Sequence, residues 1–201
     1  MDNTVCRRTG AAGRAAIIGA VGLLAVGCGL QRVPHLGHPG HHAAHSPAPA
    51  AVACSPASVR VKLDLSSTGV AAGTSYLPID FTNVSRDNCV LTGPPDVAVA
   101  TGPGGRRVGA AAAVEGAAGE PLVLAAGGTA HVWLHLASAA DLPAAACGPT
   151  KAAGFLVTLP GQARAVFVRH RLTTCARRVP GTDVLIIEPV RSGPARPGTA
   201  Q

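Results

Sequence analysis

The sequence predicts an all-β domain, an antiparallel sandwich of about seven short strands. Stretches of alternating apolar and polar residues recur over residues 54–190, and turns rich in Gly and Pro separate them. No stretch shows the 3.6-residue period of an amphipathic helix. The same region holds four cysteines, and an even number predicts two disulfides. Such disulfides would stabilise a small core that has few aromatic side chains.

The first predicted strand, residues 58–65, alternates strictly. Its apolar side chains are Val59, Val61, Leu63 and Leu65, and we expect all four to face the core. A turn follows at 69–73.

The second predicted strand covers residues 74–83, with Leu77, Ile79 and Phe81 facing inward. Pro78 has no N–H to donate to a neighbouring strand, so we expect this strand at a sheet edge or with a bulge at Pro78. Later strands are predicted at 96–100, 122–124, 129–136, 154–159, 163–170 and 184–190. Residues 110–118 are rich in Ala, but Gly109, Gly116 and Gly119 favour a loop, and 139–146 have room for one helical turn at most.

Residues 129–136 predict a strand with one polar face, formed by His131, Trp133 and His135. Four residues of strand separate the two histidines by roughly 13 Å, too far for one metal ion. We expect both at the solvent side, flanking Trp133. Trp133 is a candidate binding residue, and packing beneath a loop is the alternative.

Residues 1–27 predict a lipoprotein signal peptide. Arg7, Arg8 and Arg14 precede a short apolar run, which is shorter than the roughly 20 residues of a membrane-spanning helix. The run ends in Ala-Val-Gly before Cys28, which resembles the bacterial lipobox and predicts lipidation of Cys28. We therefore expect a protein held by lipid at the extracytoplasmic face of the cell membrane, or a secreted one if Cys28 is not lipidated. Both general and twin-arginine export stay open.

Residues 28–53 predict a tether rich in Pro and His, without an acidic residue. Its candidate metal ligands are His35, His38, His41, His42 and His45. Imidazoles at this density bind transition-metal ions, so metal capture is the alternative function. Residues 191–201 predict a disordered polar tail.

The four cysteines after Cys28 are Cys54, Cys89, Cys147 and Cys175. Four cysteines allow three pairings. We favour the sequential one, Cys54–Cys89 and Cys147–Cys175, because it ties the first strand to an early loop and one late loop to another. A zinc site is the weaker reading, since no two cysteines are close in sequence.

Basic residues exceed acidic ones after Cys28, by 14 Lys and Arg to 9 Asp and Glu. Six basic residues lie between Asp141 and Asp183 without an acidic one, and Arg169 and Arg171 among them are candidate binding residues. Such a cluster suits an anionic lipid, a phosphate-bearing wall polymer or an acidic protein, and it also suits a merely solvated face. The export signal and the lack of interleaved aromatics argue against nucleic acid.

Enzyme motifs are missing from the sequence, which has no GxSxG, HExxH or Gly-rich phosphate loop. Glu115 and Glu120 lie in a Gly- and Ala-rich segment that would hold a carboxylate pair poorly. We therefore expect a monomeric, non-catalytic binding module with no cofactor.

The order of features resembles the actinobacterial exported domain of unknown function 4232. The matching features are Cys54, Gly73-Thr74, Phe81 to Ser85, Cys89 to Pro95, Ala144 to Cys147, Pro160-Gly161, Cys175 and 184–190. Pro94 departs from the tyrosine usual after the glycine that corresponds to Gly93. The resemblance implies an immunoglobulin-like fold and a lipoprotein signal, and it implies no reaction.

Overall fold

The computed structural model describes residues 52–197, and within them the chain is mostly β. The elements are β1 (Val59–Leu63), β2 (Gly69–Ala71), β3 (Thr74–Asn83), β4 (Cys89–Leu91), β5 (Asp96–Ala100), β6 (Ala113–Val114), β7 (Leu122–Leu124), β8 (Thr129–Ala137), α1 (Ala144–Cys147), β9 (Pro149–Thr158), β10 (Ala165–Cys175), β11 (Leu185–Ile187) and β12 (Arg191–Ser192). The prediction of a mostly β domain is confirmed.

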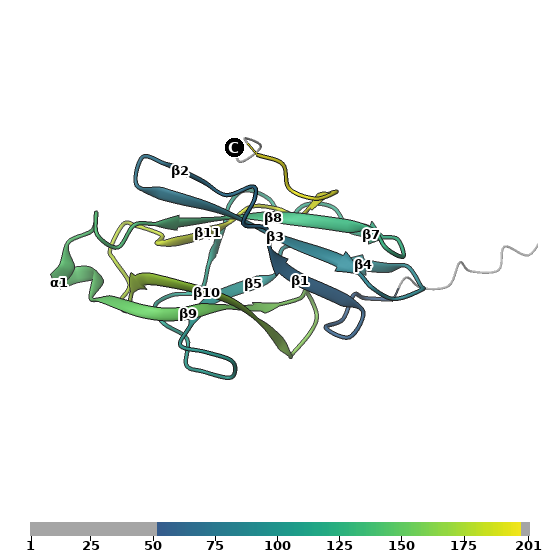
Figure 1. Cartoon of the computed structure of the whole chain (residues 1–201), viewed down its shortest axis with the longest axis horizontal. Helices are drawn as coiled ribbons and strands as arrows, with labels where there is room; N and C mark the ends of the chain where they lie inside the picture. The colour runs from purple at the N-terminus through teal and green to yellow at the C-terminus, as the bar shows by residue number, and fades with distance from the viewer. Residues whose placement is uncertain (1–51, 198–201) are drawn as a thin grey trace, which may run out of the picture. The chain divides into compact units, whose positions relative to one another are not determined.

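The strands form three sheets within the described part of the chain. The largest has the order β1-β3-β8-β11-β6, with β2 paired to β3 and β12 paired to β8. The second has the order β10-β9-β5, and the third pairs β4 with β7. Pairing is antiparallel except between β6 and β11. Figure 1 shows the largest sheet and the β10-β9-β5 sheet as two layers, with α1 at one end.

The hydrophobic core lies between these two layers. Ile79 and Phe81 of β3 and Val132 and Leu134 of β8 are fully buried, and they belong to one cluster with the buried Phe155 of β9. Burial of each such side chain contributes roughly 1.5–3 kcal/mol to folding. The alternation along β3 and β8 therefore decides which side chains enter the core.

Pro78 lies inside the largest sheet, which corrects the expectation of an edge strand. β3 pairs with β8 along one side, from Thr74 to Thr82. Along its other side β1 pairs as far as Ile79 and β2 pairs with residues 74–76, so Pro78 faces the break between them. The N–H of Asp64 donates to the Pro78 carbonyl at 3.0 Å. Because N–H and C=O of one strand residue point to the same neighbour, the missing donor of Pro78 also faces this break.

Three sequence expectations for individual segments are wrong. Leu65 follows the end of β1 and is 63% exposed, so it does not enter the core. Residues 69–71 were expected as a turn and form β2 instead. Residues 191–193 were expected in a disordered tail and are instead held against β8, because Arg191 and Ser192 pair with it and the N–H of Gly193 donates to the Thr129 carbonyl at 2.8 Å.

The two disulfides are Cys54–Cys89 and Cys147–Cys175, the pairing favoured from the sequence. They close segments of 35 and 28 residues. On the loop-entropy estimate each contributes roughly 3–4 kcal/mol. One bridge fixes the entry into β1 against β4, and the other fixes α1 against the end of β10.

A bulge in β10 brings two backbones into close approach. The register shifts between Arg169 and Leu172, and Gly154 of β9 lies opposite Arg169. A Cβ atom on Gly154 would lie 2.1 Å from the Val168 carbonyl oxygen. Only glycine fits this position without a backbone shift.

We predict that Gly154→Ala lowers the free energy of unfolding by about 2 kcal/mol or more, because backbone atoms cannot move aside as a flexible side chain can. Guanidinium unfolding of the purified chain measures it. Gly69→Ala is the matched control, since a Cβ atom there meets nothing within 4 Å. Equal stability of the two variants would contradict the close approach at the bulge.

Candidate functional site

A groove of about 580 Å³ opens between the two layers, beside the segment that leads into α1. Its apolar walls come from Leu77 of β3, Leu136 of β8 and Leu172 of β10. β1 ends at Leu63, and neither β1 nor β2 contributes a residue to the lining, whereas Leu77 lies next to the break between their pairings with β3. The groove is therefore open where the edge strand of the larger sheet breaks.

The polar side chains of the groove include His170, Ser75 and Ser138. The His170 ring stacks on Phe155 with ring centroids 5.9 Å apart. Burial lowers the pKa of His170 below its ordinary value, because the partly buried ring loses hydration of its charged form. His170 is therefore a neutral imidazole at physiological pH.

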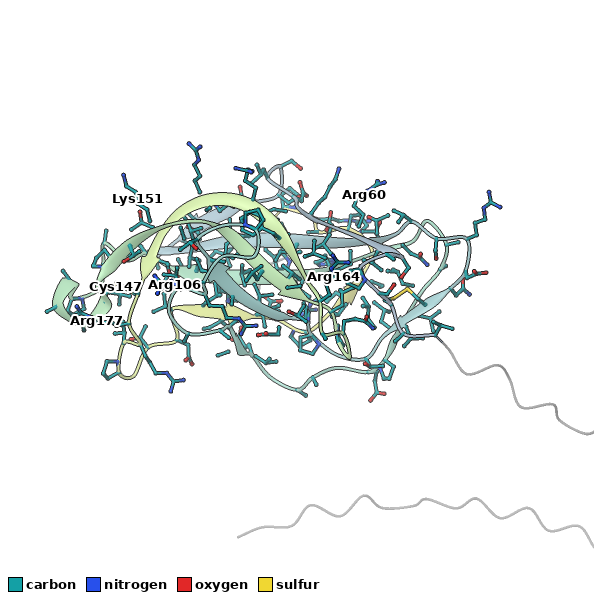
Figure 2. All side chains as sticks on the ribbon, turned by 90° about the horizontal axis from the view of Figure 1, so that it is seen from below. Arg60, Arg106, Cys147, Lys151, Arg164 and Arg177 are labelled. Carbon is teal, nitrogen blue, oxygen red and sulfur yellow. A yellow bond between two sulfur atoms is a disulfide. The ribbon has the colours of Figure 1, made fainter. Side chains whose placement is uncertain are left out.

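A basic hollow adjoins the groove. It has a volume of about 540 Å³, shares Leu172 and Thr173 with the groove, and is also lined by Lys151 and Arg171. Thr173 pairs directly with Lys151 across β9 and β10, and both cations are exposed. Figure 2 shows Lys151 toward the α1 end of this layer and Arg164 away from it. The hollow therefore places two cations next to apolar walls.

The two arginines predicted to bind differ in their placement. Arg171 lines the basic hollow. Arg169 is exposed at the start of the bulge and lines neither the groove nor the hollow. Sequence alone could not separate them, because the bulge changes the alternation between residues 169 and 172.

Trp133 does not lie on an exposed polar face, which corrects its assignment as a surface binding residue. Its side chain is 1% exposed, and it lines a separate hollow of about 220 Å³ together with Tyr76 and the β2 residues. β2 is itself a neighbour of β3 in the larger sheet, and its residues share this hollow with Trp133. Trp133 and Arg171 belong to different sheets, so the structure does not bring them together.

His131 is also buried, against expectation. It is 6% exposed, and its Nδ1–H donates to the Gly193 carbonyl at 2.8 Å. The C-terminal segment covers it, and the sequence pattern carries no signal for a contact with residues sixty positions away.

The outer-face cluster, defined as Glu115, His135 and Glu188, was missed by sequence reasoning. The Nε2–H of His135 donates to Glu188 at 2.8 Å, and Nδ1 lies 3.6 Å from the Glu115 carboxylate. The signal for it was hidden because β6 has two residues and Glu115 follows it in an Ala-rich segment. Glu120, considered with Glu115 as a pair, is not part of the cluster.

Several sequence predictions fall outside the described residues. They are Cys28 and the five linker histidines, His35, His38, His41, His42 and His45. Among the helices of residues 52–197, none is long and apolar enough to cross a membrane.

Comparison with known proteins identifies one family. Residues 54–191 match the model of the domain of unknown function DUF4232. No curated protein and no solved structure matches the chain.

We predict that His170→Gln flattens the pH dependence of stability. The His170 pKa is lowered in the folded chain, so between that pKa and the unfolded value of about 6.5 the unfolded chain binds more protons. The free energy of unfolding of the wild type therefore falls as pH drops from about 7.5 to about 5. Urea unfolding across this range measures both slopes, and identical slopes would contradict a neutral His170 in the folded chain.

Proposed function

The chain belongs to the family of the domain of unknown function DUF4232, and on that premise we propose that it is a non-catalytic binding module. In this proposal the module acts as a monomer, tethered by a lipid on Cys28 to the extracytoplasmic face of the membrane. Its site is the groove between the layers with the adjoining basic hollow. Its ligand carries an apolar segment and an anionic group, as an anionic lipid, a wall-polymer anchor or a protein segment does.

The juxtaposition of apolar walls and cations carries the proposal. Leu77, Leu136 and Leu172 offer an apolar surface, and burial of a ligand there gains roughly 25 cal/mol per Å². Arg171 and Lys151 line the basic hollow, which adjoins this apolar surface because Leu172 belongs to both. Concave apolar sites with a few polar groups at the rim are typical of binding sites.

The groove favours binding over catalysis. Ser75 and Ser138 lie in it with His170. A serine nucleophile needs a base within hydrogen-bond reach. His170 instead stacks on Phe155, and it makes no side-chain hydrogen bond to a serine within residues 52–197.

The location proposed for the module rests on two independent features. Two disulfides in a small domain indicate an oxidising compartment outside the cytoplasm. The residues before Cys28 have the order of a lipoprotein signal. Two β-layers around one core support an immunoglobulin-like sandwich as the finer description of the fold.

We predict that octanoate, a short apolar chain with a carboxylate, binds the groove. NMR of the ¹³C-labelled leucine methyl groups should show saturable shifts at Leu77, Leu136 and Leu172. Arg171→Glu should weaken octanoate binding about fivefold, which corresponds to ~1 kcal/mol, because the charge next to the groove is reversed. Octan-1-ol, which lacks the charge, should bind both forms alike.

Arg86→Glu is the control, because this substitution reverses the same charge at an exposed position beyond the far end of β3. Leucine signals that do not shift at millimolar octanoate would contradict binding of octanoate in the groove. Equal weakening by the two variants would remove Arg171 from it.

We predict that Cys28→Ala releases the protein from the membrane fraction of a bacterium that processes lipoproteins. The wild type should incorporate an alkyne-labelled fatty acid, and the variant should not, because the acylated cysteine is absent. Fractionation and in-gel detection of the label measure both. Unchanged membrane retention of the variant would contradict lipid anchoring at Cys28.

A further inference from the structure

Three adjacent strands hold the outer-face cluster. His135 pairs with Ile186 across β8 and β11, and Glu188 directly follows β11. The N–H of Glu115 donates to the Ile187 carbonyl, which continues the parallel pairing of β6. A rigid sheet, rather than a flexible loop, therefore sets the positions of the three backbones.

The His135 ring is oriented by two contacts. Its Nε2–H donates to the buried Glu188 carboxylate at 2.8 Å. The Tyr76 ring packs beside it with centroids 4.8 Å apart. A histidine that binds a metal ion usually donates its other ring N–H to a carboxylate, which fixes the ring and strengthens the ligand.

The opposite ring nitrogen faces a second carboxylate at a longer distance. Nδ1 of His135 lies 3.6 Å from Oε2 of Glu115, whose side chain is 55% exposed. Two ligands at about 2.1 Å from a tetrahedral ion lie roughly 3.4 Å apart. The Glu115 side of the ring thus has a separation suited to a shared ion, whereas the Glu188 side has that of a direct hydrogen bond.

We propose that the outer-face cluster binds a divalent transition-metal ion between Nδ1 of His135 and the carboxylate of Glu115, with Glu188 orienting the imidazole. One imidazole and one carboxylate suit Zn²⁺ and Co²⁺ better than Ca²⁺ or Mg²⁺, which prefer oxygen alone. The exposure of Glu115 leaves the remaining coordination positions to water or to a ligand. The site lies on the outer face of the larger sheet and does not depend on the groove.

The balance of charge supports a cation at this place. Two carboxylates flank one imidazole, and Arg191 lies 3.6 Å from the Glu188 carboxylate. Arg191 and the Nε2–H of His135 compensate the buried Glu188 carboxylate, so the Glu115 carboxylate is the negative charge that faces Nδ1 of His135. A metal ion on Nδ1 would strengthen the Nε2–H donation to Glu188, because it draws electron density from the ring.

Quenching of Trp133 by Co²⁺ tests the proposal in the full mature chain. Trp133 is the chain's one tryptophan and lies two residues before His135 on the same face of β8, about 7 Å away along the strand. Co²⁺ should quench it saturably, and Zn²⁺ should compete. Glu115→Gln should weaken the apparent affinity at least tenfold, since it removes a ligand.

Three further variants make the outcome decisive. Glu120→Gln removes the same charge from an exposed position outside the cluster and should titrate like the wild type. Replacement of the five linker histidines by alanine should also leave the quenching unchanged. His135→Gln should abolish it, with circular dichroism as the check that the variant folds. Absent quenching, or equal titrations of Glu115→Gln and the wild type, would overturn the site.

Discussion

The missing N–H of Pro78 is the constraint on which the arrangement of this domain depends. Its carbonyl accepts a hydrogen bond from Asp64, so its nitrogen faces the same edge and offers no donor there. The edge strand breaks at this point into β1 and β2. The β2 segment shares a hollow with Trp133, and Leu77, which lies next to the break, lines the groove. The groove therefore lies beside the break in the edge strand.

The two faces of the larger sheet consequently present different chemistry. The inner face supplies apolar walls, and the neighbouring β10 supplies Arg171 to the basic hollow. The outer face holds the carboxylates and imidazole of the outer-face cluster, and His131 in contact with the C-terminal segment. The bulge and the exposed arginines of β10 also protect an open sheet edge from pairing with other chains, because a distorted, charged edge is a poor template. The exposed arginines of β10 therefore protect the sheet edge, in addition to the binding role that we propose for Arg171.

The sequence predicted what local periodicity controls. The bounds of β3, β5 and β7 agree with the predicted ones, since each has a clear apolar pattern between turn residues. It missed β2, β4, β6 and β12, which have two or three residues and show no period. It misplaced Trp133 and His131 because other segments cover the polar face of β8, and alternation shows only which residues share a face. The groove was beyond prediction for the same reason, because β3, β8 and β10 contribute one leucine each.

The central claim is that the groove, with the adjoining basic hollow, is the binding site. Photo-cross-linking in intact cells tests this claim most directly. A benzoylphenylalanine replaces Thr173, shared by the groove and the basic hollow, or Val123 on β7 as the control, which is 60% exposed. Mass spectrometry then identifies what is captured. The account predicts a reproducible adduct at position 173 that Arg171→Glu removes, and none at position 123. The same adducts at both positions, or an adduct at 173 that survives Arg171→Glu, would contradict it.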